Sequence, residues 1–207
     1  MTMNRVIHAA VRRDLARLEG ALGAGRDGDT ARAGQLLRAY QNLRRELTHH
    51  HEGEDELIFP MLSRLQVDPV LLEAMESEHQ AMAAALTDTS AAMERYAATG
   101  SADDARAARA SVVQTQQVVD QHLTHEEQDL EPVLLPHLES AEWKAVEKKL
   151  SRQPPGIAGR FFAWIEDGMD EESRTYLRGT VPAPVRFILG RFFGRQYHRE
   201  IAPVWSA

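Results

Sequence analysis

Apolar residues recur at the spacing of one helix face through positions 1–140 of the chain. In the first segment these apolar positions are Val6, Val11, Leu15, Leu18 and Leu22. Their separation by three to five residues is typical of an amphipathic helix and not of a strand. The residues between the breaks in the pattern are rich in Ala, Leu, Arg, Glu and Gln, which favour helix. The pattern therefore predicts long helices joined by short turns.

Three breaks divide these residues into four helical segments. They are "GAGRDGD" at 23–29, "QVDP" at 66–69 and "ATGSADD" at 98–104. Each break carries residues that can cap the helix that follows: Asp29 or Thr30, then Asp68, then Ser101 or Asp103. Four helices with short connections are typical of an up-down-up-down bundle. We therefore expect an all-α fold, with a four-helix bundle over residues 1–140.

The composition changes after residue 150. The segment "SRQPPG" at 151–156 breaks the helical pattern, and the residues beyond it hold five of the six phenylalanines, with arginines between them. The aromatic spacing predicts short amphipathic helices, so we expect residues 141–207 to form a helical extension packed on the bundle. The alternatives for this segment are contact with a protein partner or second copy of the chain, with a membrane surface, or, least favoured, with nucleic acid.

Charge and cysteine content exclude several classes of function. Residues 1–150 hold 16 Lys and Arg against 25 Asp and Glu, a balance of −9, and residues 151–207 hold 8 against 6, a balance of +2. An acidic main body argues against non-specific nucleic-acid binding. The chain has no cysteine, which excludes disulfides, thiolate metal sites and thiol catalysis. It has no apolar leader and no segment long enough to span a membrane, so we expect a cytoplasmic protein.

An internal repeat gives the strongest signal of chemistry. The stretch "HHEGEDELIFPML" from His50 aligns without a gap on "HLTHEEQDLEPVL" from His122. The alignment matches Glu54 with Glu126, so each copy carries His-x-x-x-Glu. In a helix, residues four apart lie on one face, and each pair therefore points two metal donors in the same direction. Each copy also has a proline six residues after the glutamate, which can kink the helix near the site.

A second pair of histidines follows nearly the same period. His8 and His79 are separated by almost the same offset as His50 and His122, and each has a leucine seven positions further on. At a rise of about 1.5 Å per residue, the path out to each turn and back brings these histidines level with the His-x-x-x-Glu segments. Two similar hairpins would thus build one metal site in the bundle interior. Its predicted ligands are His8, His50, Glu54, His79, His122 and Glu126.

The donor types narrow the choice of metal. Imidazole with carboxylate suits iron, manganese or zinc, and no thiolate is present to favour a softer ion. Two ions close together need bridging anions, which also offset the buried charge. We therefore assign Glu54 and Glu126 as bridges, with two terminal histidines on each ion, as in other bundle cores.

Other residues near these positions are alternatives. His51 with Asp55 repeats the same spacing one residue further on, but only the register from His50 agrees with the internal repeat. The remaining candidates lie about 100° away from the ligand face, or beside a ligand in the sequence. We expect them to be exposed or to touch the ligands: His49, His51, Glu78 and His125.

The six positions resemble those of the hemerythrin-like family of HHE cation-binding domains. The resemblance rests on these residues and on the tails "ELIFPML" and "DLEPVL", and it covers roughly residues 4–138. It implies a four-helix bundle around two non-haem iron ions, bridged by carboxylates and an oxo or hydroxo group. The resemblance implies that such a centre binds or reacts with O2, peroxide or nitric oxide.

The chain departs from the oxygen-carrying members of that family. Those members have His-x-x-x-His on the third helix, whereas here Ala83 follows His79 by four residues; they also have Asp five residues after the fourth-helix histidine, where this chain has Glu127. Without the fifth histidine the ligand sets of the two ions become more alike, and one coordination position is left open. Both changes argue against simple reversible O2 carriage. The resemblance then implies a protein that binds, senses or reacts with these small molecules, with peroxide decomposition as the enzymatic version. The alternatives are an interaction or regulatory module with a structural metal, and an iron-handling or iron-centre repair protein.

Overall fold

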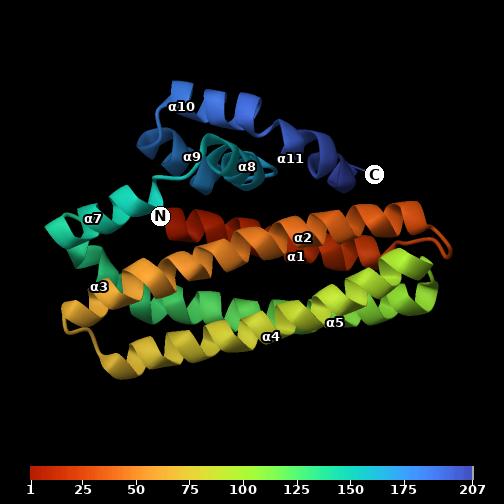
Figure 1. Cartoon of the computed structure of the whole chain (residues 1–207), viewed down its shortest axis with the longest axis horizontal. Helices are drawn as coiled ribbons and strands as arrows, with labels where there is room; N and C mark the ends of the chain where they lie inside the picture. The colour runs from red at the N-terminus through yellow and green to blue at the C-terminus, as the bar shows by residue number, and fades with distance from the viewer. Residues whose placement is uncertain (207) are drawn as a thin grey trace.

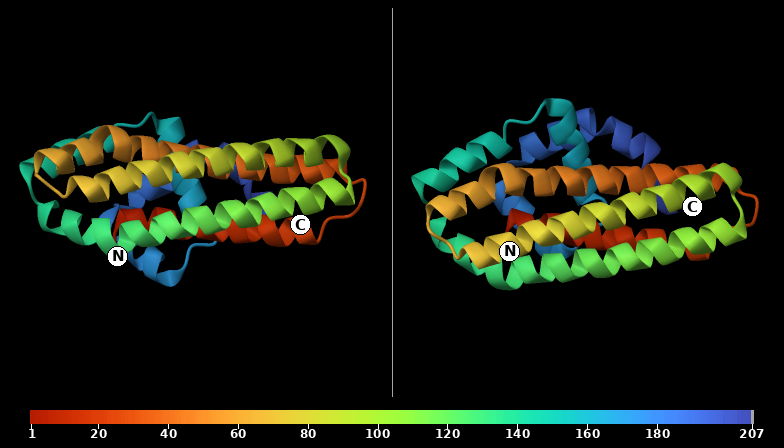
Figure 2. Two further views of the ribbon diagram at one scale, coloured as in Figure 1. Left: turned by 90° about the horizontal axis from the view of Figure 1, so that it is seen from below. Right: turned by 60° about the horizontal axis from the view of Figure 1, so that its bottom comes forward.

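The computed structural model describes residues 1–206, and every regular element in this range is a helix. The four longest elements are α1 (Met3–Gly23), α2 (Thr30–Gly53), α4 (Pro69–Thr99) and α5 (Ala102–His125). They run side by side along the long axis of the molecule, and the chain turns back at its two ends (Figures 1 and 2). The predicted all-α class is confirmed.

Capping residues start three of these helices where the sequence predicts them. The caps whose side chains accept a hydrogen bond from the first helical turn are Asp29, Asp68 and Ser101. Helix α4 ends at Thr99 and is capped by Gly100, whose φ of 65° lies in the left-handed region that glycine adopts without strain. A Cβ at this glycine would lie 2.9 Å from the backbone nitrogen of Thr30, so the two turns at this end of the molecule are in close contact.

Two short π-helical turns occur at equivalent positions of the repeat, η1 (Glu54–Ile58) after α2 and η2 (Glu126–Leu130) after α5. In each turn the backbone N–H that follows it donates to the carbonyl of the glutamate that begins it. Pro60 and Pro132 come just after these turns and have no N–H to continue the α-helical pattern, so the hydrogen bonding shifts ahead of them. The helices then resume as α3 (Phe59–Arg64) and α6 (Glu131–Leu134).

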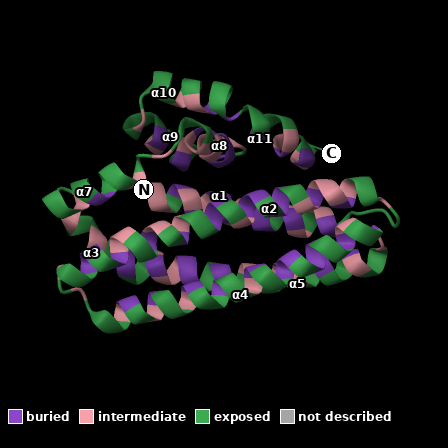
Figure 3. Cartoon of the chain, in the orientation of Figure 1, coloured by how far each residue is buried: buried purple, intermediate pink, exposed green. Residues whose placement is uncertain are grey.

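The buried side chains form two apolar clusters, and buried positions follow the inward faces of the helices (Figure 3). The larger cluster fills the bundle toward Gly100 and includes the fully buried Tyr40 and Tyr96. The smaller cluster closes the opposite end with Phe59, Met75 and their neighbours. His79 and the glutamates that begin the π turns lie at one height along the helices. This height falls between the two apolar clusters. Polar side chains at this level are therefore enclosed by apolar packing on both sides.

Residues 141–206 form short helices, and most of them lie against the face made by α1 and α2 (Figure 1). These elements are α7 (Ala141–Leu150), α8 (Pro155–Glu166), α9 (Glu171–Thr180), α10 (Ala183–Ile188), η4 (Leu189–Phe193), α11 (Arg195–Glu200) and η5 (Ala202–Ser206). Val146 of α7 belongs to the smaller apolar cluster and Trp164 of α8 to the larger. The apolar core of the long helices therefore continues into these short helices. The predicted domain boundary at residue 140 stays a prediction.

A buried polar contact joins the extension to α1. Trp164 is fully buried, and its indole Nε1 donates to a carboxylate oxygen of Asp14 at 2.8 Å. Asp14 is itself fully buried and accepts a second hydrogen bond, also 2.8 Å long, from the guanidinium of Arg13. A second ion pair, 2.9 Å long, joins Arg160 to the buried Glu46 of α2. These contacts satisfy carboxylates that could not be buried alone.

Part of the extension leaves aromatic side chains in solvent, although Tyr197 of α11 is fully buried. The exposed fractions of Phe187, Phe192 and Phe193 are 61%, 50% and 45%. Within the aromatic segment, Trp164 of α8 is therefore buried while these phenylalanines of α10 and η4 face solvent, and the predicted packing of residues 141–207 as an extension stays a prediction. No helix within residues 1–206 combines the length and the apolar character needed to cross a bilayer.

Candidate metal centre

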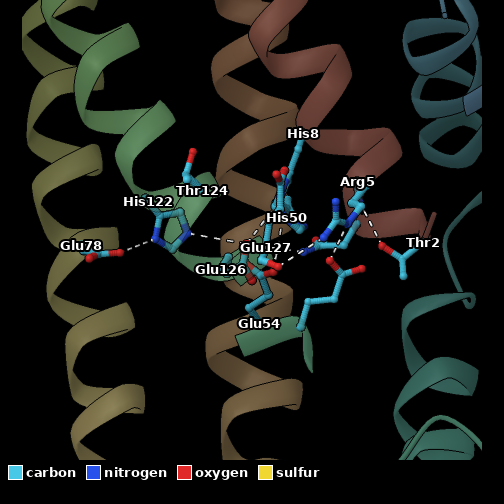
Figure 4. Close-up of polar contacts among 12 residues, drawn as sticks. Thr2, Arg5, His8, His50, Glu54, Glu78, His122, Thr124, Glu126 and Glu127 are labelled. Carbon is cyan, nitrogen blue, oxygen red and sulfur yellow. Dashed lines mark hydrogen bonds and ion pairs between the residues drawn. The ribbon is translucent and has the colours of Figure 1, made fainter. Parts of the chain in front are cut away.

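The six predicted ligands meet in the interior, at the level where α1, α2, α4 and α5 face one another. Figure 4 shows five of them, His8, His50, Glu54, His122 and Glu126, gathered between the helices. All six residues are buried except His50, whose side chain is 10% exposed. The residues that the internal repeat marks in the sequence therefore lie close together in the structure.

Glu54 lies between one histidine of the first hairpin and one of the second. Its Oε1 is 3.4 Å from Nε2 of His50, and its Oε2 is 3.6 Å from Nε2 of His79. The two oxygens of one carboxylate thus face two different imidazoles. This is the arrangement expected of a carboxylate that spans two cations.

Glu126 occupies the equivalent place on the other hairpin. Its Oε2 is 3.1 Å from Nε2 of His8 and 3.8 Å from Nε2 of His122. His8 and His50 lie together, with their Nε2 atoms 3.4 Å apart, and the rings of His79 and His122 have centroids 4.7 Å apart. The donors therefore form two groups of imidazoles, and each glutamate reaches both groups.

Several of these donor atoms are buried without a hydrogen-bond partner. They include Nε2 of His79, Nε2 of His122 and Oε2 of Glu54. Buried polar atoms in proteins are almost always paired, because desolvation without a partner costs about 1–3 kcal/mol for each group. A cation coordinated by these lone pairs would satisfy all three atoms at once. The residues present therefore fit a metal ion held by imidazole and carboxylate.

A second set of carboxylates holds the outer nitrogens of three imidazoles. The Nδ1 atoms lie within 2.7–2.9 Å of a carboxylate oxygen in the pairs His8 with Glu127, His79 with Asp55, and His122 with Glu78. An Nδ1–H that donates to a carboxylate leaves the Nε2 lone pair free for a metal and fixes the ring orientation. The alignment of the repeat matches Asp55 with Glu127, so the sequence carries a signal for these two pairings.

Burial and charge set the protonation of the first group of imidazoles. Burial and the neighbouring His8 lower the pKa of His50 to about 3, so this imidazole stays neutral at neutral pH. Burial also opposes a charge on His8, but the hydrogen bonds to Glu126 and Glu127 outweigh it and raise the pKa of His8. Burial thus keeps His50 neutral, whereas the two carboxylates favour a proton on His8 that a bound cation would displace.

The two glutamates of the centre differ in the same way. Burial and the charge of Glu126 raise the pKa of Glu54 well above its usual value. Burial acts in the same direction on Glu126, but the hydrogen bond and charge of His8 lower the pKa of that carboxyl. A proton on Glu54 keeps two buried carboxylates from being charged together, and a cation would replace that proton.

His51 is the most deeply buried of the histidines that we expected to be exposed or to touch the ligands. It is 7% exposed, and its ring lies 4.3 Å from the ring of His79 and 5.4 Å from that of His122, centroid to centroid. The neighbouring His49 has a side chain that is 47% exposed, and that of His125 is 30% exposed. Of the histidines expected to lie off the ligand face, His51 alone is buried in the centre.

A pocket of about 420 Å³ reaches this level between α2 and α4. Its lining includes His51, His79, Asp55 and Ala83. Ala83 stands where oxygen-carrying relatives have a histidine, so the side chain that would fill part of this space is absent. The pocket gives a small molecule access to the imidazoles from the solvent.

Helices that project buried histidines and glutamates into a shared interior define a class of helical cation-binding proteins. The comparison with known families gives the particular family: the model for the hemerythrin HHE cation binding domain matches residues 5–134, well over half of the chain. The chain belongs to this family, and the resemblance drawn from the sequence is confirmed. A search of curated proteins and a search of solved structures each found no match.

Proposed function

We propose that this chain is a hemerythrin-like protein with two non-haem iron ions that binds, senses or reacts with O2, peroxide or nitric oxide. Its scaffold would be the up-down-up-down bundle of α1, α2, α4 and α5, with the short helices as a C-terminal extension. The ligands would be His8, His50, Glu54, His79, His122 and Glu126. The observation that carries the proposal is the convergence of buried, unpartnered donor atoms from both hairpins.

The contacts suggest a division of the ligands between the two ions. His8 and His50 would hold one ion, and His79 and His122 the other, because each pair of rings lies together. Glu54 and Glu126 would reach both ions, since each glutamate faces one histidine of either pair. Iron in this position supplies redox chemistry toward small oxidants.

The remaining polar residues would position the ligands and manage protons. Glu127 accepts from Nδ1 of His8 and is held by a 2.6 Å hydrogen bond from Arg12, and these two donors lower its pKa to about 2 against the effect of burial. A carboxylate that stays charged keeps the proton on Nδ1 of His8 and leaves Nε2 for the metal. Apolar packing on both sides of this level excludes water, apart from the pocket between α2 and α4. Such an enclosed site suits a diatomic molecule or peroxide.

The test is metal content with an optical spectrum, on protein produced in iron-replete cells and purified in air. We expect about two irons per chain and near-ultraviolet bands that change when peroxide is added. In the enzymatic version, peroxide addition releases oxygen, and His79→Ala abolishes the release whereas His49→Ala does not. Zinc, a single ion or no metal under these conditions would contradict the proposal.

The exposed aromatic residues of the extension favour a second candidate function. Phe187 and Phe192 are exposed beside arginines, and the guanidinium of Arg195 lies 5.3 Å from the ring centre of Phe192. Exposed aromatics with arginine are common at protein interfaces. In this version the metal only stabilises the bundle, and the extension binds a protein partner. Partner binding that survives Glu54→Ala with Glu126→Ala but is lost in Phe187→Ser with Phe192→Ser would favour this candidate over oxidant chemistry.

A further inference from the structure

His51 is a histidine of the buried cluster that the proposed ligand set does not use. It extends from α2 into the interior, and its Nε2 is buried without a hydrogen-bond partner. The unpartnered atoms of His79 and His122 lie in the same cluster, and donor atoms of these three histidines all fall within 4.8 Å of one another. An orphaned imidazole nitrogen is costly in an interior, and here three such nitrogens share one place.

The ring positions agree with a single shared ion. The centroid distances are 4.3 Å for His51 with His79, 4.7 Å for His79 with His122, and 5.4 Å for His51 with His122. Imidazoles on adjacent positions of one ion, with metal–nitrogen bonds of about 2.1 Å, have centroids about 4.5 Å apart. The rings of His51 and His79 are also stacked, with planes 21° apart, so packing accounts for part of this spacing, and the unpaired nitrogens at this spacing are what favour an ion.

The adjacent positions of His50 and His51 do not conflict with this arrangement. Neighbouring helical residues point about 100° apart, so the two rings cannot serve the same ion in the same way. Nε2 of His50 instead lies 3.4 Å from Nε2 of His8, while the ring of His51 lies beside those of the other pair. Two successive residues of α2 therefore supply the two ends of the centre.

The pocket between α2 and α4 explains why His51 can occupy this place. Ala83 lines that pocket together with His51 and His79. A larger side chain at Ala83 would enter the same space from α4. With alanine there, the space beside His79 is left to the imidazole that comes from α2.

We propose that His51 is a third histidine ligand of the ion held by His79 and His122. The two ions are then inequivalent, with three histidines at one and two at the other, contrary to the expectation from the sequence that the loss of the fifth histidine makes them alike. This inference rests on the proposed two-metal site, and it deepens that proposal by assigning a ligand to one of the ions.

The experiment measures the affinity of the full-length chain for Co²⁺, after its metal has been removed with a chelator. Titration against a chromophoric chelator gives the number of ions bound and the dissociation constant of each, and the visible bands of Co²⁺ report the ligands. The variants are His51→Ala and His51→Gln, with His49→Ala as the matched control from the same tract. The melting temperature of each metal-free variant is measured in parallel.

We expect the wild-type chain and His49→Ala to bind two ions with the same constants and spectrum. In His51→Ala the affinity for one ion falls by about 100-fold or more, because losing a ligand costs at least as much as losing a residue that only orients one. His51→Gln shows a similar loss, since an amide oxygen is a poor ligand for this ion. Added imidazole, at a concentration that leaves the wild-type spectrum unchanged, restores the missing band in His51→Ala.

The other outcomes overturn the inference at identifiable points. If the wild-type chain binds fewer than two ions, the proposed function fails and the ligand assignment fails with it. If the wild-type chain binds two ions and His51→Ala keeps both constants and the spectrum, only the assignment fails. A fall in affinity that imidazole does not rescue, together with a lower melting temperature of the metal-free variant, makes His51 a packing residue and overturns the assignment as well.

Discussion

Replacing Trp164 should weaken the whole bundle and not only the extension that carries this residue. Its indole is fully buried between α8 and α1 and donates to the buried carboxylate of Asp14. Truncation of a buried tryptophan to alanine costs about 3–5 kcal/mol of unfolding free energy. In Trp164→Phe most of the ring remains, and the main loss is the hydrogen bond to a charged group, about 1.5–3 kcal/mol. Because Arg13 still pairs with Asp14, we expect a value near the lower end.

The assay is urea unfolding of the full chain in a chelator, followed by helical circular dichroism. The chelator is needed because a bound ion stabilises the folded state by mass action and would hide part of the loss. Phe187→Ala is the matched control: it removes an aromatic residue of the same extension that is 61% exposed, and we expect a change within about 0.5 kcal/mol. Limited proteolysis at 151–156 gives a second readout, and cleavage should be faster in Trp164→Ala than in the control.

Two results would refute this reasoning. A loss below about 1 kcal/mol in Trp164→Ala would mean that the indole is not packed as a core residue. A separate early transition, with the main transition unchanged, would mean that the extension unfolds alone and that the core is not continuous from α1 into α8. Equal losses in the alanine and phenylalanine variants would assign the whole effect to the hydrogen bond with Asp14.

Two further predictions follow from the site and from a turn. Protons on His8 and Glu54, whose pKa values are both raised, must leave when an ion binds, so Co²⁺ affinity should fall as the pH falls, by up to about tenfold per displaced proton for each pH unit. Titrations from pH 7.5 to pH 5.5 with an indicator dye test this, and a pH-independent affinity would refute it. Gly100→Ala should lower the unfolding free energy by at least about 1 kcal/mol because of its positive φ and the nearby Thr30, whereas Gly20→Ala, in open space within α1, should raise it by about 0.5–1 kcal/mol, as measured by thermal unfolding.

Local sequence signals were enough to predict the helices, and they marked most of the residues that lie together in the interior. Asp29, Asp68 and Ser101 cap the helices where turn chemistry predicts, because a cap depends on the few residues around it. The internal repeat located His50 and His122, since two copies of one pattern restrict the register more than one copy can. The other four positions follow from the same repeat, and the roles of all six residues as ligands stay predictions.

Features that depend on tertiary contacts were not predictable in this way. A single helical face cannot include both His50 and His51, so the pattern left open whether His51 is exposed or touches the ligands, and only the packing of the helices shows that it is buried. The buried carboxylate of Asp14 accepts a hydrogen bond from the adjacent Arg13, but it also accepts one from Trp164, 150 residues further along the chain. Periodicity within α1 carries no information on that partner.

The paired π turns affect which mutations these helices can accept during evolution. Each such turn holds one residue more than a turn of α-helix, so it is what a single inserted residue produces. Upstream of the insertion, α2 presents His50 to the centre; downstream, α3 presents Phe59 and Met61 to the smaller cluster. The extra residue offsets the two parts of the helix in rotation about the helix axis, so that each part presents its own face to its own neighbours. Mutations that reshape the end cluster can therefore accumulate without rotating the histidines away from their partners.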